Sequence, residues 1–302
     1  MPLTFHAILG IRITTSSRED IFSYIRTSSK KIITIVTPNP EQLVYARKDK
    51  HFAQLLNDAD IAIPDGIGLV AAMRLLNKLS AVSCQLSAFN RIPGVEFMED
   101  LVAMAAKNGW SVALVGGRGG VAQESLELLK KKYPGLVGWA EELGEMPILP
   151  ISNTTRFANP LRRIEARPPA RRANIKYYQY TKDIIEKISK TKTSIVFVGL
   201  GAPKQEYFME AISCQLSERS YQPDVQNMLK AESWKLKAPF VLMSVGGSFD
   251  ILAGRVRRAP LFVRTMGLEW LWRLVREPWR FSRQLALVKF LWLVLRMKFS
   301  EY

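Results

Sequence analysis

Short apolar runs alternate with longer amphipathic stretches along this chain of 302 residues. Continuous apolar runs bounded by turn residues are typical of buried strands. The predicted strands are 32–36, 61–63, 111–115, 136–139, 194–198 and 240–245. The predicted helices are 41–56, 66–76, 95–108, 121–132, 182–189 and 204–216. Because strands and helices alternate, the pattern predicts an α/β fold with a mostly parallel sheet that helices cover on both faces.

Polar residues directly follow two neighbouring predicted strands. Thr37 and Asn39 come after strand 32–36, which two prolines end, and Asp65 follows strand 61–63 between a proline and a glycine. Open α/β sheets bind ligands at the edge where their parallel strands end. A carboxylate on a tight turn at that edge suits a general base, so Asp65 and Asn39 are candidate catalytic residues. The alternative is structural, a turn aspartate and an asparagine that caps the next helix.

Glycine-rich turns follow three other predicted strands. Backbone N–H groups at the start of the next helix attract anions, so these glycines are candidate neighbours of a phosphate. They are Gly116, Gly117, Gly199, Gly201, Gly246 and Gly247. Tight strand-to-helix turns also need glycine for structural reasons, and both interpretations stay open. None of the turns forms a G-x-G-x-x-G fingerprint with an acidic residue after the next strand, which argues against the alternative of a nucleotide-dependent oxidoreductase.

Positive charge is concentrated at the carboxyl-terminal end of the chain. The net charge of +16 indicates an anionic partner, which is nucleic acid, acidic lipid or a phosphorylated substrate. Residues 251–302 contain 11 basic and 3 acidic residues, a net charge of +8. Four of the seven tryptophans lie there too, with an apolar run at 285–295 that is too short to span a bilayer. This combination favours an anionic membrane surface over nucleic acid. The alternative is a terminal helix packed on the domain.

The chain offers little material for metal or cysteine chemistry. It has two histidines and two cysteines, so we expect no metal site and no cofactor. Asp58 and Asp60 resemble an acidic metal motif, but they fall at a predicted helix end before a strand and are interpreted as structural. The amino terminus lacks the pattern of a secretory signal, which predicts a cytoplasmic protein.

Three segments interrupt the α/β pattern. Residues 81–87 recur at 211–217 with a single change, and 145–180 is rich in proline and arginine without periodicity. Surface loops tolerate added sequence at a small entropic cost. We therefore expect a core of residues 1–265, followed by a basic, tryptophan-rich appendage of residues 266–302. The expected insertions in the core lie near 80–89, 145–180 and 213–237.

Seven short motifs, in order over nearly the whole chain, resemble those of the WecG/TagA/CpsF glycosyltransferases, which form glycosyltransferase family 26. They are Thr-Pro-Asn-Pro-Glu-Gln (37–42), Pro-Asp-Gly (64–66), Arg-Ile-Pro-Gly (91–94), Gly-Leu-Gly-Ala-Pro-Lys-Gln-Glu (199–206), Val-Gly-Gly-Ser-Phe-Asp (245–250), Arg-Ala-Pro (258–260) and Gly-Leu-Glu-Trp-Leu-Trp-Arg-Leu (267–274). Each motif is short, but the combination is specific.

The resemblance implies a Rossmann-like fold with a carboxyl-terminal helical appendage that associates with the membrane. It implies a cytoplasmic enzyme, peripheral on the inner face of the cell membrane, that builds cell-surface polysaccharide or teichoic acid. Such an enzyme transfers an N-acetylmannosamine-type sugar, or its uronate, from UDP to a polyprenyl-diphosphate-linked N-acetylglucosamine, without a metal. The alternative is a basic membrane- or nucleic-acid-binding α/β protein in which the insertions have impaired catalysis. The oligomeric state, including a homo-oligomer, is left open.

The resemblance also implies roles for individual residues. Asp65 corresponds to the base, with Thr37 and Asn39 beside it. Around the substrates, the family's positions correspond here to Arg91, Gln205 and Asp250. Arginines of the appendage correspond to Arg273, Arg280 and Arg283.

Overall fold

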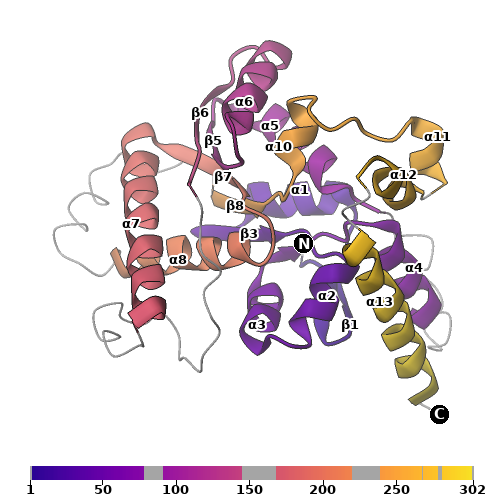
Figure 1. Ribbon diagram of the computed structural model, residues 1–302. Coiled ribbons are helices and arrows are strands. Elements are labelled where there is room, and N and C mark those ends of the chain that lie inside the picture. The colour runs from indigo at the N-terminus through magenta and orange to yellow at the C-terminus, as the bar shows by residue number, and fades with distance from the viewer. Residues whose placement is uncertain are drawn as a thin grey trace.

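A six-stranded parallel sheet forms the centre of the computed structural model, which describes residues 2–77, 91–144, 168–219, 239–266, 268–277 and 281–300 (Figure 1). The strand order is β4-β3-β8-β7-β5-β6, and every neighbouring pair is parallel. The strands are β3 (Ile32–Val36), β4 (Ile61–Ala62), β5 (Ser111–Gly116), β6 (Val137–Glu141), β7 (Thr193–Gly199) and β8 (Phe240–Ser244). The predicted α/β fold with a mostly parallel sheet is confirmed.

The central strands consist mainly of apolar residues because both of their faces are covered. In β7, Ile195 and Phe197 pack into one core cluster, whereas Val196 and Val198 pack into the other. Successive side chains of a strand point to opposite faces, so a strand buried on both sides reads as a continuous apolar run.

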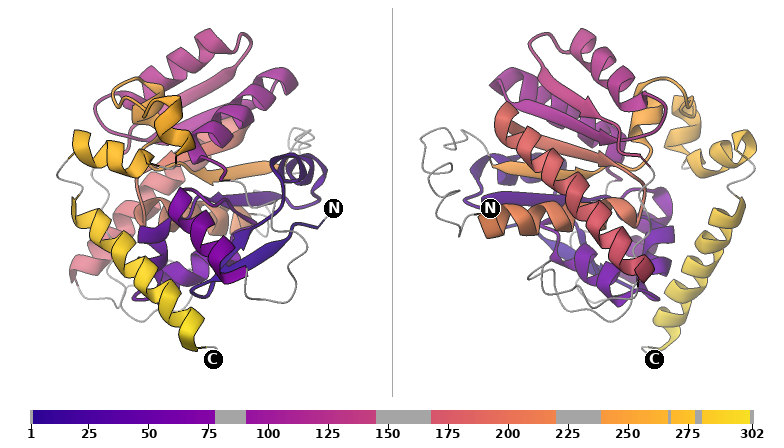
Figure 2. Two further views of the ribbon diagram at one scale, coloured as in Figure 1. Left: turned by 90° about the vertical axis from the view of Figure 1, so that its right-hand side faces the viewer. Right: turned by 60° about the vertical axis from the view of Figure 1, so that its left-hand side comes forward.

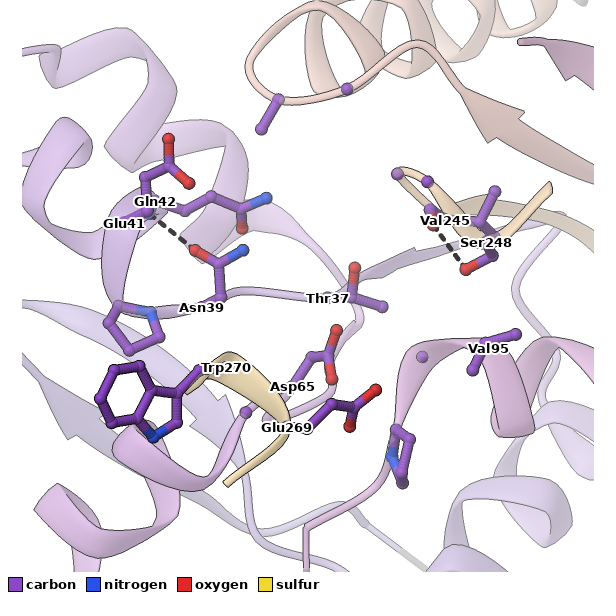
Figure 3. A pocket seen from close by; sticks show the side chains of 18 of the residues that line it. Thr37, Asn39, Glu41, Gln42, Asp65, Val95, Val245, Ser248, Glu269 and Trp270 are labelled. Atoms are coloured by element: carbon purple, nitrogen blue, oxygen red, sulfur yellow. Dashed lines mark hydrogen bonds between the residues drawn. The ribbon is translucent and has the colours of Figure 1, made fainter. Parts of the chain in front are cut away.

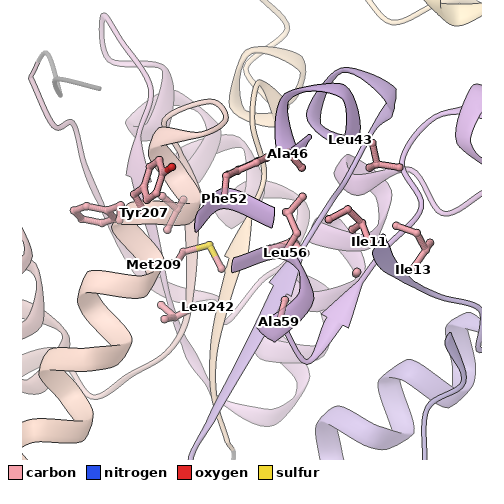
Figure 4. Close-up of a cluster of buried hydrophobic side chains, with 14 of the residues drawn as sticks. Ile11, Ile13, Leu43, Ala46, Phe52, Leu56, Ala59, Tyr207, Met209 and Leu242 are labelled. Carbon is pink, nitrogen blue, oxygen red and sulfur yellow. The ribbon is translucent and has the colours of Figure 1, made fainter. Parts of the chain in front are cut away.

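Helices form a layer on each face of the sheet. The helices of one layer contribute to a single core cluster. They are α2 (Pro40–Ala46), α3 (Lys50–Asp58), α4 (Ile67–Asn77), α7 (Pro168–Thr191), α8 (Lys204–Arg219) and α13 (Phe281–Ser300). Figure 4 shows part of this cluster, where Phe52 and Leu56 of α3 lie near Tyr207 and Met209 of α8. The other layer contains α1 (Arg18–Thr27), α5 (Gly94–Asn108), α6 (Val121–Lys132) and α10 (Ser248–Leu252).

An antiparallel hairpin precedes the sheet and was not among the predicted elements. Its strands β1 (Phe5–Ile8) and β2 (Ile11–Thr14) are joined by Leu9 and Gly10, both at positive φ. Two-residue turns of this kind match the twist of the paired strands. Thr14 Oγ1 accepts a hydrogen bond of 2.9 Å from the Ala62 backbone N–H, which attaches the hairpin to the β4 edge of the sheet.

Two predicted boundaries differ from the structure. The predicted helix 41–56 is two helices, because Asp49 accepts a hydrogen bond of 2.9 Å from Phe52 N and caps α3. Residues 168–180 and 213–219, expected within surface insertions, form parts of α7 and α8. Gln215 Nε2 donates to Thr181 Oγ1 at 2.6 Å and so joins the two helices. The rest of the expected insertions, segments 80–89, 145–167 and 220–237, lies outside the described residues.

The short helix α11 (Leu261–Thr265) precedes the appendage, whose described helices are α12 (Glu269–Arg276) and α13. In Figure 2, α13 (yellow) runs along the same side of the molecule as α2 and α4, and it contacts both helices. Phe290, Leu293 and Val294 of α13 are buried in the core cluster. Among the described residues, no helix is long and apolar enough to cross a membrane.

Candidate active site

A cavity of about 660 Å³ lies at the carboxyl ends of β3, β4 and β8 and at the loop after β7 (Figure 3). The sequence-predicted residues that line it are Thr37, Asn39, Asp65, Arg91, Gln205, Asp250, Gly201, Gly246 and Gly247. These residues come from five separate parts of the chain. The fold therefore brings together most of the site that the sequence motifs indicate.

Backbone hydrogen bonds fix the position of Asp65 in the cavity. Ile63 N donates to Val36 O at 2.8 Å, and Asp65 N donates to Pro38 O at 3.2 Å. These two hydrogen bonds join the segments that follow β3 and β4, beyond the last residues of the strands. Gly66 follows at a φ of 110°, a conformation that favours glycine, and turns the chain into α4.

Asn39 combines its structural role with a place in the cavity. Its Oδ1 accepts a hydrogen bond of 3.0 Å from Gln42 N, so the residue caps α2 as the structural alternative predicted (Figure 3). Its Nδ2 makes no hydrogen bond to another described residue and can donate to a bound ligand. Thr37 is buried, and its Oγ1 donates to Ser244 O at 3.3 Å, which links the ends of β3 and β8.

Gly94 allows the start of α5 to approach the candidate base. A Cβ atom at this position would lie 3.2 Å from Thr37 Cγ2 and 3.7 Å from Asp65 Oδ2. The amino-terminal end of a helix carries partial positive charge, so α5 stabilises the negative charge of the Asp65 carboxylate. Gly94 belongs to the motif 91–94, but only this contact shows that it lets α5 approach Asp65.

Gln205 and Glu206 form a buried polar pair beside the cavity. Gln205 Oε1 accepts a hydrogen bond of 3.0 Å from Gly246 N, and its Nε2 donates to Glu206 Oε1 at 2.8 Å. Glu206 Oε2 is buried and has no hydrogen-bond partner among the described residues. Burial without a cationic partner raises the pKa of the Glu206 carboxyl to about 7. Sequence reasoning did not single out Glu206.

Three ion pairs join Arg91 and Glu96 to residues between 258 and 269. Arg91 Nη2 donates to Glu269 Oε2 of α12 at 2.6 Å and lies 4.0 Å from Asp65 Oδ1. Glu96 of α5 accepts from Arg258 Nη2 at 2.9 Å and from Arg264 Nη1 at 3.3 Å. Glu269 also lines the cavity, where it lies beside Asp65 in Figure 3. Sequence reasoning missed it because no local pattern pairs it with Arg91.

The chain matches the sequence profile of the glycosyl transferase WecG/TagA/CpsF family over residues 6–147, 158–221 and 222–302. This chain belongs to that family. It is therefore a glycosyltransferase. Residues 148–157, which the match leaves out, fall inside the segment expected to be an insertion.

The described lining of the glycosyltransferase's cavity contains more negative than positive charge. Its acidic residues are Glu41, Asp65, Asp250 and Glu269, and its basic residues are Arg91 and Arg258. Both of these arginines are already in ion pairs. Arg280 lies outside the described residues, and Arg273 and Arg283 belong to helices in which their side chains are not described.

Three of the six glycines named in the sequence analysis do not line the cavity. A Cβ at Gly117 would lie 2.5 Å from Val121 Cγ1. A Cβ at Gly116 would lie 2.8 Å from Gly199 O, and one at Gly199 would lie 2.5 Å from Phe249 Cε2. These three glycines are therefore required by close packing between adjacent turns, whereas Gly201, Gly246 and Gly247 lie at the cavity.

No group of three or more His, Cys, Asp or Glu residues within the described part of the chain could hold a metal ion. Asp60 has a structural role, as expected. Its Oδ2 accepts hydrogen bonds from Thr34 N at 2.8 Å and from Thr34 Oγ1 at 3.0 Å, which ties it to β3.

Proposed function

We propose that this glycosyltransferase moves an N-acetylmannosamine-type sugar, or its uronate, from UDP to a polyprenyl-diphosphate-linked N-acetylglucosamine, with inversion and without a metal. The product would enter cell-surface polysaccharide or teichoic-acid synthesis. The observation that carries the proposal is the convergence of Asp65, Thr37 and Asn39 in one cavity with Arg91 and Gln205, in a chain of this family.

Asp65 acts as the base in this reaction. Its carboxylate accepts the proton of the acceptor hydroxyl while that oxygen forms a bond to the anomeric carbon of the donor sugar. The bond between the anomeric carbon and UDP breaks on the opposite face, and its electron pair leaves with the phosphate oxygen. Asn39 Nδ2 donates a hydrogen bond that orients one of the two sugars.

The leaving UDP needs positive charge that the described cavity residues do not supply. Its diphosphate gains negative charge as the bond to the sugar breaks, and arginines stabilise such charge through paired hydrogen bonds. We assign this role to Arg273, Arg280 and Arg283 of the appendage. The excess of acidic over basic residues in the described lining supports the assignment.

The same appendage attaches the enzyme to the inner face of the cell membrane, where a polyprenyl-linked acceptor is found. Large apolar side chains are exposed along its helices and along α11, which precedes it. They are Leu261, Phe262, Met266, Trp270, Leu271, Val275, Phe281, Leu285, Val288, Leu291, Trp292 and Leu295. Together with the net charge of +8 in residues 251–302, this surface suits insertion among anionic headgroups. Trp270 and Leu291 of this set also line the cavity, so the lipid surface borders the site.

Release of UDP tests the proposal directly. Purified protein is incubated with UDP-sugars that differ in epimer and oxidation state, with or without a short-chain lipid-diphosphate N-acetylglucosamine. We expect release only with an N-acetylmannosamine-type donor and only when the acceptor is present. Equal release with all donors, or none with any of them, would contradict the proposed substrates. Flotation with anionic liposomes, compared with a gel-shift assay on DNA, separates membrane attachment from nucleic-acid binding.

A further inference from the structure

Arg91 lies between two carboxylates that belong to different parts of the molecule. Its Nη2 donates a hydrogen bond of 2.6 Å to Glu269 Oε2 and lies 4.0 Å from Asp65 Oδ1. The first distance is a short charge-assisted hydrogen bond, and the second is beyond hydrogen-bond reach. Glu269 is the first residue of α12 in the appendage, whereas Asp65 and Arg91 belong to the core.

The site is shielded enough for a change of partner to matter. The side chains of Arg91 and Glu269 are 19% and 10% exposed, and that of Asp65 is 37% exposed. Charges in such surroundings attract one another more strongly than at an open surface. A guanidinium that loses Glu269 would leave a poorly solvated charge, and Asp65 is the other carboxylate within 4.0 Å in the described part of the chain.

Three other charged residues belong to the described lining of the cavity. They are Glu41, Asp250 and Arg258. Arg258 is bonded to Glu96, which also accepts from Arg264, so it is anchored to α5. Arg91 is thus the described cavity cation that lies between the candidate base and the appendage.

We propose that Glu269 is a positioning residue that holds the Arg91 guanidinium away from Asp65 when α12 is docked on the core. Without the Glu269 carboxylate, Arg91 moves from 4.0 Å into hydrogen-bond distance of Asp65, and a carboxylate bonded in this way accepts the acceptor's proton poorly. The appendage therefore sets the state of the base through Glu269 and Arg91. The inference rests on the proposed function, in which Asp65 is that base.

Glu269→Gln tests this role in the full-length protein with a soluble acceptor analogue. Glu96→Gln is the matched control, because it removes a carboxylate that bonds Arg258 and Arg264, shortly before α12, but does not bond to Arg91. We expect Glu269→Gln to lower kcat by about tenfold or more. We also expect the acid limb of the pH profile of kcat/KM to move to lower pH, because a bonded arginine favours the ionised form of Asp65. In Glu96→Gln the acid limb stays at its wild-type position. An unmoved limb in Glu269→Gln, or the same movement in both variants, overturns the proposal.

Two further measurements keep the test decisive. Glu269→Asp retains the negative charge, so we expect it to recover part of kcat and the wild-type acid limb, and it replaces Glu269→Gln if that variant does not fold. A crystal structure of the folded variant gives a readout that needs no activity, with Arg91 expected at about 3 Å from Asp65 in Glu269→Gln. If the wild type transfers no sugar but Arg91 changes partner, the proposed function fails and the positioning role stands. If transfer occurs and Arg91 keeps its place in the variant, the positioning role fails.

Discussion

At the scale of single residues, Asp65 owes its place in the cavity to backbone contacts with the end of β3 and to the close approach of α5 at Gly94. We expect Asp65→Asn to lower the turnover number of sugar transfer by about 10² to 10⁴, the usual contribution of a positioned base. The amide keeps the shape of the side chain, so UDP affinity and melting temperature should stay close to those of the wild type. Asp58→Asn, at an exposed carboxylate outside the cavity, is the control. Turnover of Asp65→Asn within about tenfold of the wild type would exclude the base role.

Glu206 makes the stability of the fold depend on pH. Its pKa is raised from 4.5 to about 7, so the folded protein keeps a proton that the unfolded chain loses between these values. The stability contributed by this group is complete below pH 4.5, falls as the pH rises and is lost above about pH 7. The loss corresponds to about 3 kcal/mol. Glu206→Gln removes the ionisation, so we expect a higher free energy of unfolding at pH 8 than in the wild type and a smaller difference between pH 5 and pH 8.

Urea unfolding at the two pH values measures this effect. Glu127→Gln replaces an exposed glutamate of α6 and should keep the pH dependence of the wild type. Equal pH dependence in Glu206→Gln and the wild type would show that the buried carboxyl does not titrate in this range.

At the scale of elements, α13 has two faces with different neighbours. Phe290 is fully buried against the core, whereas Trp292 is 55% exposed. The sequence analysis left two alternatives for this region, a membrane-surface helix or a terminal helix packed on the domain. One face of α13 is buried as in a packed helix, and the other face is exposed. We expect Phe290→Ala to lower the melting temperature, because a large-to-small change in a core costs about 3 to 5 kcal/mol.

Trp292→Ala is the matched substitution on the exposed face. We expect it to leave the melting temperature within the range of ordinary surface changes and to weaken flotation with anionic liposomes. Circular dichroism melts and liposome flotation on both variants give the comparison. A melting temperature lowered equally by the two substitutions would mean that Trp292 is covered by protein in solution.

At the scale of the whole molecule, the proposed reaction depends on arginines and helix ends and not on a divalent ion. The chain has two histidines, and the part of it that the structure describes contains no group of residues suited to a metal ion. We expect UDP release to be unchanged in EDTA and by added Mg²⁺ or Mn²⁺. Activity that is lost in EDTA and restored by either ion would contradict metal independence.

The sequence alone predicted the parallel α/β architecture and the polar ends of β3 and β4. Strands buried on both faces need continuous apolar residues, and this signal is local. The same locality explains the omissions, because β1 and β2 are four residues each and the break between α2 and α3 depends on the cap at Asp49. The role of Asn39 as a helix cap was also readable from its neighbours in sequence.

Only the tertiary structure decided which chemical groups meet. The bond between Arg91 and Glu269 joins residues 178 positions apart, and no periodicity relates them. The same is true of the burial of Glu206, the packing of Gly199 on Phe249 and the division of α13 into a buried and an exposed face. A sequence pattern reports which face of an element is apolar, whereas partners of opposite charge and the loss of water around a carboxyl arise only when distant elements pack together.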